Sequence, residues 1–277
     1  MIIRLNQTAF GSPGHLADTC LMTHQHRRVE EDVPLAGGRM TSGIVRRGNR
    51  LLRPMGPWSP AVHEYLHHLE TAGFEGSPQV LGIESAREVL TFIDGDVAVD
   101  PQWEPGHGHR LPPYARTDLA LRAVADLLRQ LHAAASGFQP AITSYRFRPR
   151  PPRAGEIISH GDLGPWNTVY RDGIPVAFID WDSAGPVSPL DDLADAAWTF
   201  VPLAPPRQLI EAGFDPLPDL PARLRLFVEA YGLTDRKAIL PALERSMTGV
   251  AGRPTNAVDA ASLQWLRGVA TKFAGAL

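Results

Sequence analysis

Residues 158–182 read ISHGDLGPWNTVYRDGIPVAFIDWD, and the interpretation of the whole chain starts from this stretch. Asp172-Gly173 suits the positive φ angles of a tight turn and is flanked by β-prone residues. The pattern therefore predicts a β-hairpin from Thr168 to Ile179. Because the polar residues lie just before and just after this hairpin, we expect it to bring together Asp162, Asn167 and Asp180.

These residue types suit phosphoryl transfer. That reaction needs a carboxylate to accept the proton of the attacking hydroxyl, and oxygen ligands that hold Mg²⁺ on the nucleotide phosphates. Magnesium prefers a few hard oxygen ligands and keeps water and phosphate in its other positions. Protein kinases space the same groups as H-R-D-x-x-x-x-N followed by a later Asp, which is the spacing of Asp162, Asn167 and Asp180.

The pattern HGD…N…IDWD, followed by Asp192-Leu193-Ala194, resembles the aminoglycoside phosphotransferase family, which is close to choline kinase and has a protein-kinase-like fold. The resemblance implies an α+β, bilobal protein with a small β-rich N-lobe and a larger, mainly helical C-lobe. It implies ATP-dependent transfer of the γ-phosphate to a hydroxyl of a small acceptor, either an aminoglycoside-like antibiotic or a hydroxylated metabolite. ATP (or GTP) and Mg²⁺ are the implied cofactors.

The resemblance also assigns roles to residues. Asp162 is the expected base, with His160 as an orienting member of the catalytic group. Asn167 and Asp180 are the expected Mg²⁺ ligands, and Asp182 is a further ligand or a supporting group. Asp192 is expected to support the catalytic loop.

Other interpretations of the same residues remain open. The plainest is a hairpin whose aspartates only cap turns, although an ordered set of four polar positions is more than turn capping requires. A catalytically weak, nucleotide-binding regulatory relative of the same fold is the main functional alternative. A metal-dependent phosphohydrolase built on His160 and Asp162 ranks last, because the surrounding sequence does not supply the further ligands.

Composition restricts the function classes. The chain has 277 residues, 44% hydrophobic and 21% charged, with a net charge of −3, as in an ordinary globular protein with no nucleic-acid footprint. One cysteine, Cys20, excludes an internal disulfide framework, and no apolar run is long enough to cross a bilayer. We therefore expect a cytoplasmic protein without a nucleic-acid or membrane partner. The sequence does not indicate the oligomeric state.

Three segments are predicted: a flexible N-terminal extension (1–28), a nucleotide-binding N-lobe (29–94), and a catalytic and acceptor-binding C-lobe (95–277). In the N-lobe, residues 33–54 read as a strand, a glycine loop and two further strands. Gly37 and Gly38 in that loop are expected to cover the nucleotide phosphates.

The N-lobe contains no lysine, because the two lysines of the chain are Lys237 and Lys272. Arg53 is the candidate to replace the phosphate-binding lysine of the kinase fold, and a surface arginine is the alternative. The segment 59–72 reads as a helix capped by Ser59. Glu64 on this helix could hold the phosphate-binding cation, but the register places Val62 or His63 nearer that slot.

Thr91-Phe92-Ile93-Asp94-Gly95 resembles the hinge between kinase lobes, where Phe92 and Ile93 are expected to contact the nucleotide base. C-lobe helices are expected at about 115–135, 190–200, 207–212, 220–231, 236–248 and 258–274, with Leu119 and Leu121 on the buried face of the first. A polycationic acceptor would need an acidic pocket, and the candidate residues are Asp94, Asp96, Asp100, Glu104, Asp191 and Asp195.

Overall fold

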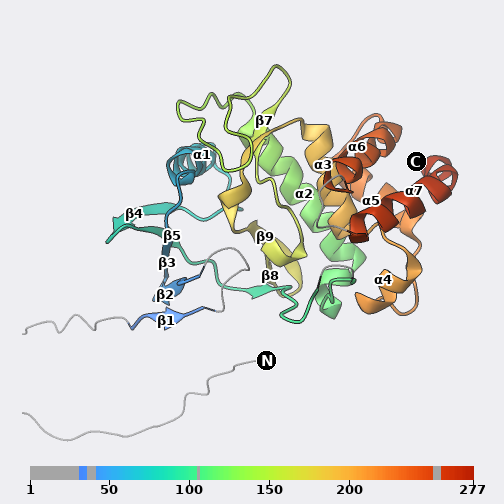
Figure 1. Ribbon diagram of the computed structural model, residues 1–277, viewed down its shortest axis with the longest axis horizontal. Coiled ribbons are helices and arrows are strands. Elements are labelled where there is room, and N and C mark those ends of the chain that lie inside the picture. The colour runs from blue at the N-terminus through green and yellow to red at the C-terminus, as the bar shows by residue number, and fades with distance from the viewer. Residues whose placement is uncertain (1–30, 36–41, 105–106, 252–256) are drawn as a thin grey trace, which may run out of the picture. The chain divides into compact units, whose positions relative to one another are not determined.

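The computed structural model describes the backbone of residues 31–35, 42–104, 107–251 and 257–277. Side chains are described in the same ranges, except for residues 249–261. Residues 32–277 form one compact unit, which contains a β-sheet lobe and a helical lobe. The fold is therefore α+β and protein-kinase-like, as expected from the sequence (Figure 1). The predicted extension, residues 1–28, lies outside the described residues.

The β-sheet lobe is a five-stranded antiparallel sheet in the order β1-β2-β3-β5-β4. Its strands are β1 (Val33–Pro34), β2 (Val45–Arg47), β3 (Arg50–Pro54), β4 (Val80–Glu84) and β5 (Arg87–Thr91). The two strands predicted around the Gly48-Asn49 turn are present as β2 and β3. The register of β3 and β5 places Arg53 directly opposite Glu88, which becomes important at the site.

Helix α1 (Ser59–Thr71) follows β3 and buries Tyr65, Leu66 and Leu69. The prediction that Ser59 caps this helix is wrong. Trp58 occupies the cap position, and the Ser59 hydroxyl instead accepts a hydrogen bond from the Gly56 amide at 3.0 Å, so that it closes the turn before the helix.

The central hairpin forms as predicted, from β8 (Thr168–Arg171) and β9 (Ile174–Phe178). Asp172 and Gly173 have φ angles of 51° and 78°, the left-handed values that this tight turn requires. Strand β6 (Asp96–Val97) pairs with β8. A separate antiparallel pair is formed by β7 (Ile157–Ser159) and β10 (Gly185–Val187). These two strands lie just before and just after residues 160–182, so their pairing brings the two ends of that segment together.

The helical lobe is built on α2 (Asp118–Ala135), which contacts β9 and α5 (Figure 1). The other helices are α3 (Pro189–Phe200), α4 (Pro206–Glu211), α5 (Leu220–Tyr231), α6 (Ile239–Ala251) and α7 (Ala257–Ala276). Short 3₁₀ turns lie at Pro113–Arg116, Pro165–Asn167, Trp181–Ser183 and Arg236–Ala238. All the predicted helices are present, with ends shifted by a few residues.

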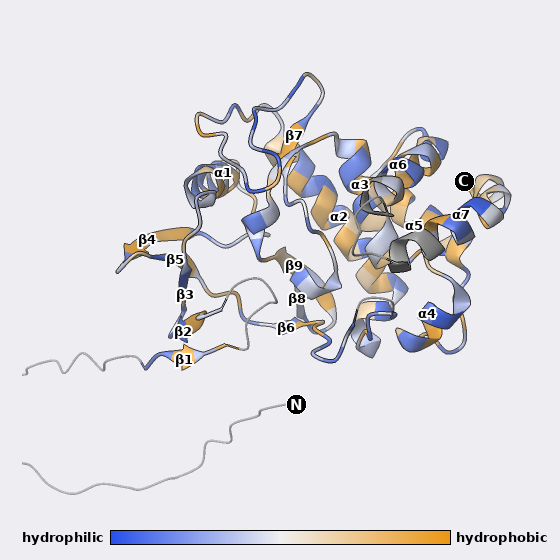
Figure 2. Ribbon diagram, viewed as in Figure 1, coloured by the Kyte–Doolittle hydropathy of each residue, from blue (hydrophilic) through white to orange (hydrophobic). Residues whose placement is uncertain are grey.

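Helix α2 alternates apolar and polar bands along its length (Figure 2), and Leu121, Val124 and Leu128 are buried. The prediction for Leu119 is wrong, because its side chain is 63% exposed. Its neighbours Ala120 and Leu121 are buried in the same turn, and at about 100° per residue Leu119 lies on the opposite face of the helix from Leu121 and Leu128. Within the described part of the chain, no helix combines the length and apolarity that crossing a membrane would require.

Candidate active site

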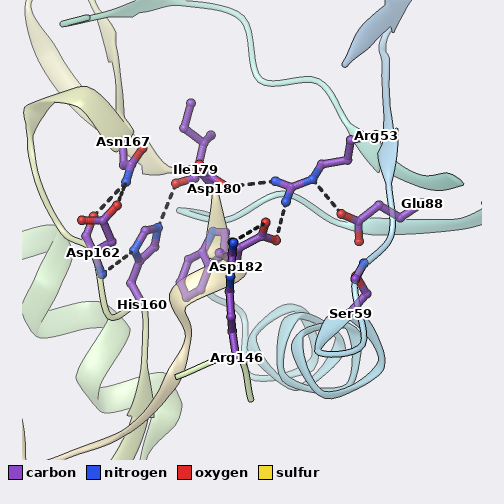
Figure 3. Close-up of polar contacts among 12 residues, drawn as sticks. Arg53, Ser59, Glu88, Arg146, His160, Asp162, Asn167, Ile179, Asp180 and Asp182 are labelled. Atoms are coloured by element: carbon purple, nitrogen blue, oxygen red, sulfur yellow. Dashed lines mark hydrogen bonds and ion pairs between the residues drawn. The ribbon is translucent and has the colours of Figure 1, made fainter. Parts of the chain in front are cut away.

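The loop between β7 and β8 carries the predicted base. The Asn167 amide nitrogen donates to both the carboxylate and the backbone carbonyl of Asp162, each at 2.9 Å. These two bonds fix the direction of the carboxylate (Figure 3). Gly161 makes the loop possible, because its φ is +80° and a Cβ there would collide with the Ser183 carbonyl oxygen.

His160 is fully buried beneath this loop, against the ring of Trp181. Its Nδ1 accepts the Asp162 amide at 3.3 Å, and its Nε2 donates to the Ile179 carbonyl at 2.8 Å. These partners assign the neutral tautomer with the proton on Nε2. His160 thus connects the backbone of Asp162 to the end of β9, where Asp180 follows Ile179. This is a positioning role.

Asp192 supports the same loop from α3. Its carboxylate accepts from the Ser159 hydroxyl at 2.6 Å and pairs with His132 Nε2 at 2.9 Å. The other ring nitrogen of His132 bonds the Tyr231 hydroxyl at 2.8 Å. This geometry agrees with the supporting role expected for Asp192, and His132 and Tyr231 extend the same network.

Arg53 reaches from β3 toward the end of β9. Its guanidinium is 3.0 Å from Asp180 and also pairs with Asp182, and its Nε is 2.8 Å from Glu88 (Figure 3). The side chain is only 5% exposed. Burial alone would lower the pKa of Arg53, but the carboxylates of Asp182, Asp180 and Glu88 outweigh burial and raise it. Arg53 is therefore a fixed positive charge and not a surface arginine.

The partner that holds Arg53 is Glu88, which the sequence had not suggested. Glu88 is 3% exposed, and its second oxygen is 2.5 Å from Nε2 of His63 on α1. The residue of α1 that supports Arg53 is thus His63, and it does so through Glu88 on β5. Glu64 instead accepts the backbone amides of Ala141 and Ile142 at 2.7 and 2.8 Å, so it anchors a distant loop.

The two aspartates at the end of β9 differ in their surroundings. Asp180 has a left-handed backbone (φ 65°), a strained conformation that is common at functional sites, and its side chain is 41% exposed. Asp182 is 10% exposed and faces both Arg53 and, at 3.7 Å, Arg146. Burial raises the pKa of Asp182 despite the opposing effect of Arg53.

The pKa of Asp162 is also raised. Desolvation by burial is the largest cause, the hydrogen bond from Asn167 opposes it, and the negative charge of Asp180 adds to it. A carboxylate with a raised pKa is better matched to accepting a proton near neutral pH.

The donor set fits a magnesium ion. The side-chain nitrogen of Asn167 bonds Asp162, so the side-chain oxygen of Asn167 points away from that carboxylate. Asp180 presents a partly exposed carboxylate. Both are the hard oxygen ligands that Mg²⁺ prefers. In the described ranges, no cluster of three or more His, Cys, Asp or Glu side chains could hold a metal by itself. An ion that also uses nucleotide phosphates as ligands needs no such cluster.

The remaining predicted nucleotide contacts are only partly described. Gly37 and Gly38 lie outside the described residues. The Phe92 amide donates to the Asn49 carbonyl at 2.9 Å, and Arg46 covers the Phe92 ring at 3.9 Å. The Phe92 amide is therefore already engaged within the sheet lobe. Contact of Phe92 and Ile93 with a nucleotide stays a prediction, as does a metal role for Asp182.

A cavity of about 470 Å³ opens beside Asp162. Its walls come from the catalytic loop, from the loop before α2, and from α3 and α4. Among the lining residues are Trp103, His109, Trp166, Asp195 and Trp198. Its position places any bound molecule next to the Asp162 carboxylate.

The fold and this site define a small-molecule phosphotransferase that acts on hydroxyl groups. Residues 143–227 match the phosphotransferase enzyme family. The chain is also 33% identical over 215 residues to the trifolitoxin immunity protein of Rhizobium leguminosarum bv. trifolii, covering 76% of this chain and 77% of that protein. The chain therefore belongs to the family of that protein, within the phosphotransferase enzyme family.

Solved structures agree on the fold. The gentamicin complex of the aminoglycoside phosphotransferase APH(2")-IIa is 12% identical, with a TM-score of 0.52, and the match covers 86% of this chain and 92% of that one. The ternary complex of the same enzyme with streptomycin and ATP is 13% identical, with a TM-score of 0.51, covering 80% and 84%. At these identities the likeness shows the protein-kinase-like fold alone.

Proposed function

We propose that the protein transfers the γ-phosphate of ATP to a hydroxyl group of a small acceptor held in the cavity beside Asp162. The observation that carries this proposal is the position of Asp162, which lines that cavity and is aimed by two hydrogen bonds from Asn167. Arg53 and Asp180 pair with each other at 3.0 Å, and they would supply the cation and the metal ligand that triphosphate oxygens need. We place the reaction in the cytoplasm, where ATP is available.

In this mechanism Asp162 orients the acceptor hydroxyl and accepts its proton as the new oxygen–phosphorus bond forms. His160 and Asn167 keep the carboxylate in place. Arg53 binds phosphate oxygens with its guanidinium, which Glu88 and His63 hold from behind. Asn167 and Asp180 would hold Mg²⁺, whose chemistry is to neutralise charge on the phosphates.

The curated relative bears on the acceptor. It is named as an immunity protein toward trifolitoxin, and this chain shares a third of its sequence over most of its length. We therefore propose that the acceptor is a toxic or antibiotic molecule and that phosphorylation of its hydroxyl protects the cell. A hydroxylated metabolite is the alternative acceptor within the same mechanism.

The test is ATP consumption with a panel of hydroxylated acceptors. Asp162→Asn keeps the shape of the side chain but removes the base, so it should lower kcat at least about 100-fold while the thermal shift caused by Mg-ATP is retained. Asp180→Asn should abolish the Mg²⁺-dependent part of that shift. An Asp162→Asn variant with undiminished turnover would refute the mechanism.

One observation favours a second function, a nucleotide-binding protein with weak or no transfer activity. Arg53, the proposed phosphate-binding cation, is already paired with the carboxylates of Glu88, Asp180 and Asp182. Asp180 must release Arg53 before it can bind a metal ion. A protein of this kind would show the Mg-ATP thermal shift without acceptor-dependent turnover. The same two assays therefore distinguish the two functions.

A further inference from the structure

The walls of the acceptor cavity are aromatic on the side that meets the base. The rings of Trp103 and His109 are 6.4 Å apart, and the rings of His109 and Trp166 are 5.3 Å apart. Trp166 follows Asp162 by four residues on the same loop and lines the same cavity, so this row of three rings begins beside the base. Trp198, from α3, lines the same cavity.

The same walls offer little negative charge. Among the residues whose side chains the structure describes, the lining carboxylates apart from Asp162 are Asp192 and Asp195. Asp192 is 2% exposed and is engaged by His132 and Ser159. Asp195 accepts a hydrogen bond from Ser246, and burial, as the largest cause, raises its pKa to about 6. Three basic side chains, Arg148, His107 and His109, line the cavity as well.

The other acidic residues that could have served a polycation are elsewhere. Of the six candidates named from the sequence, Asp195 lines this cavity and the other five do not. Asp94 pairs with Arg46 at 3.0 Å, and Asp191 pairs with Arg245 at 2.6 Å. A polycation entering the cavity would lose its water and, among the described side chains, meet few carboxylates in exchange, which is unfavourable.

Resting on the transfer reaction proposed above, we infer that the acceptor is an uncharged ring-bearing alcohol or phenol whose ring packs against one of the mutually tilted rings of Trp103, His109 and Trp166. Aromatic faces bind such rings through dispersion and apolar contact and require no charge on the ligand. A ring held there presents its hydroxyl to Asp162. The shared chemistry, a hydroxyl on an uncharged ring with an apolar face, is found both in sugars and in phenols.

The test measures binding separately from turnover. Asp162→Asn protein with Mg-ADP is titrated calorimetrically with methyl β-glucoside, phenyl β-glucoside, N-acetyltyrosinamide, gentamicin and streptomycin, at low and high salt. We expect the tightest uncharged ring compound to bind at least roughly tenfold more strongly than either polycation, with little dependence on salt. The two glucosides and the tyrosine amide show whether a sugar ring or an aromatic ring is preferred.

Trp103→Leu and Trp198→Leu should each weaken the binding of the ring compounds. The control is Trp265→Leu, which removes an indole that packs on Phe273 away from the cavity and should leave the affinity unchanged. Tighter binding of gentamicin or streptomycin would overturn the inference, as would failure of every uncharged ring compound to bind. Ring compounds that bind but are not phosphorylated by the unmodified protein would refute the transfer reaction and leave this account of the cavity intact.

Discussion

At the scale of single residues, the state of Asp162 should govern how activity depends on pH. Only the carboxylate form can accept the proton, and desolvation raises the pKa of this group above the ordinary aspartate value of 3.8. We expect kcat/KM to fall as the pH drops, with an inflection above 3.8. Profiles measured with saturating Mg-ATP would show this limb, and its absence from the unmodified enzyme would argue against Asp162 as the base.

Gly161 gives a second prediction at this scale. Replacement by Ala forces a side chain into a left-handed backbone and against the Ser183 carbonyl oxygen, which should displace the neighbouring base. Gly155 has the same φ of +80° and nothing within 4 Å of a Cβ. Gly155→Ala should therefore lower the free energy of unfolding by about 1 to 2 kcal/mol and leave kcat unchanged.

Gly161→Ala should lower the free energy of unfolding by more than Gly155→Ala does and should also reduce kcat. Urea unfolding and steady-state kinetics on both variants measure the two effects. Equal losses in the two variants would mean that the contact with Ser183 places no constraint on the loop.

The residues that could be predicted from the sequence are those whose contacts are local. Asp162 and Asn167 are five positions apart, so the loop that contains them determines their contact. The partnership of Arg53 with Glu88 instead depends on the register of two strands, which the sequence does not specify. The distribution of acidic residues around the cavity depends in the same way on how loops fold back.

At the scale of elements, α1 and the sheet should act together on the nucleotide through the contacts from His63 to Glu88 and from Glu88 to Arg53. Glu88→Gln keeps the side-chain shape but removes a buried charge that holds the guanidinium. We expect the KM for ATP to rise roughly tenfold, with a smaller change in kcat. His63→Ala should shift the KM in the same direction.

Glu84→Gln is the matched control, because Glu84 pairs with Arg47 and Arg50 at the outer surface of the same sheet. Surface pairs contribute little, so its kinetics should match those of the unmodified protein. Equal effects of Glu84→Gln and Glu88→Gln on the KM for ATP would show that the loss comes from general weakening of the sheet.

Element positions were predictable where periodicity or turn chemistry is strong. The hairpin formed because Asp172-Gly173 admits one kind of turn, and α5 has the bounds expected from its apolar spacing. The start of α1 was predicted less well. Ser59 is a residue type that often caps helices, but its hydroxyl accepts a hydrogen bond from the Gly56 amide in the preceding turn.

At the scale of the whole molecule, stability should depend on pH through Asp195. Its pKa is about 6 in the folded protein, against 3.8 ordinarily, because burial disfavours the charged form and Asp192 and Asp191 add repulsion that Arg148 and Ser246 only partly offset. Between these two values the folded state binds more protons than the unfolded state. The contribution of this residue to stability is therefore fully present below about pH 4 and is lost as the pH rises to about 6.

Asp195→Asn removes the ionisation and keeps a group that can bond Ser246. The variant should thus gain stability relative to the unmodified protein as the pH rises from 4 to 7, by roughly 1 to 3 kcal/mol at neutral pH. Asp126→Asn is the control, because Arg129 lowers the pKa of Asp126 and its effect has the opposite sign. Urea unfolding across this pH range measures all three proteins. Parallel curves for Asp195→Asn and the unmodified protein would show that folding does not raise the pKa of Asp195. The Asp195 carboxylate would then be hydrated and charged at neutral pH, and the cavity wall would carry more negative charge than its contacts indicate.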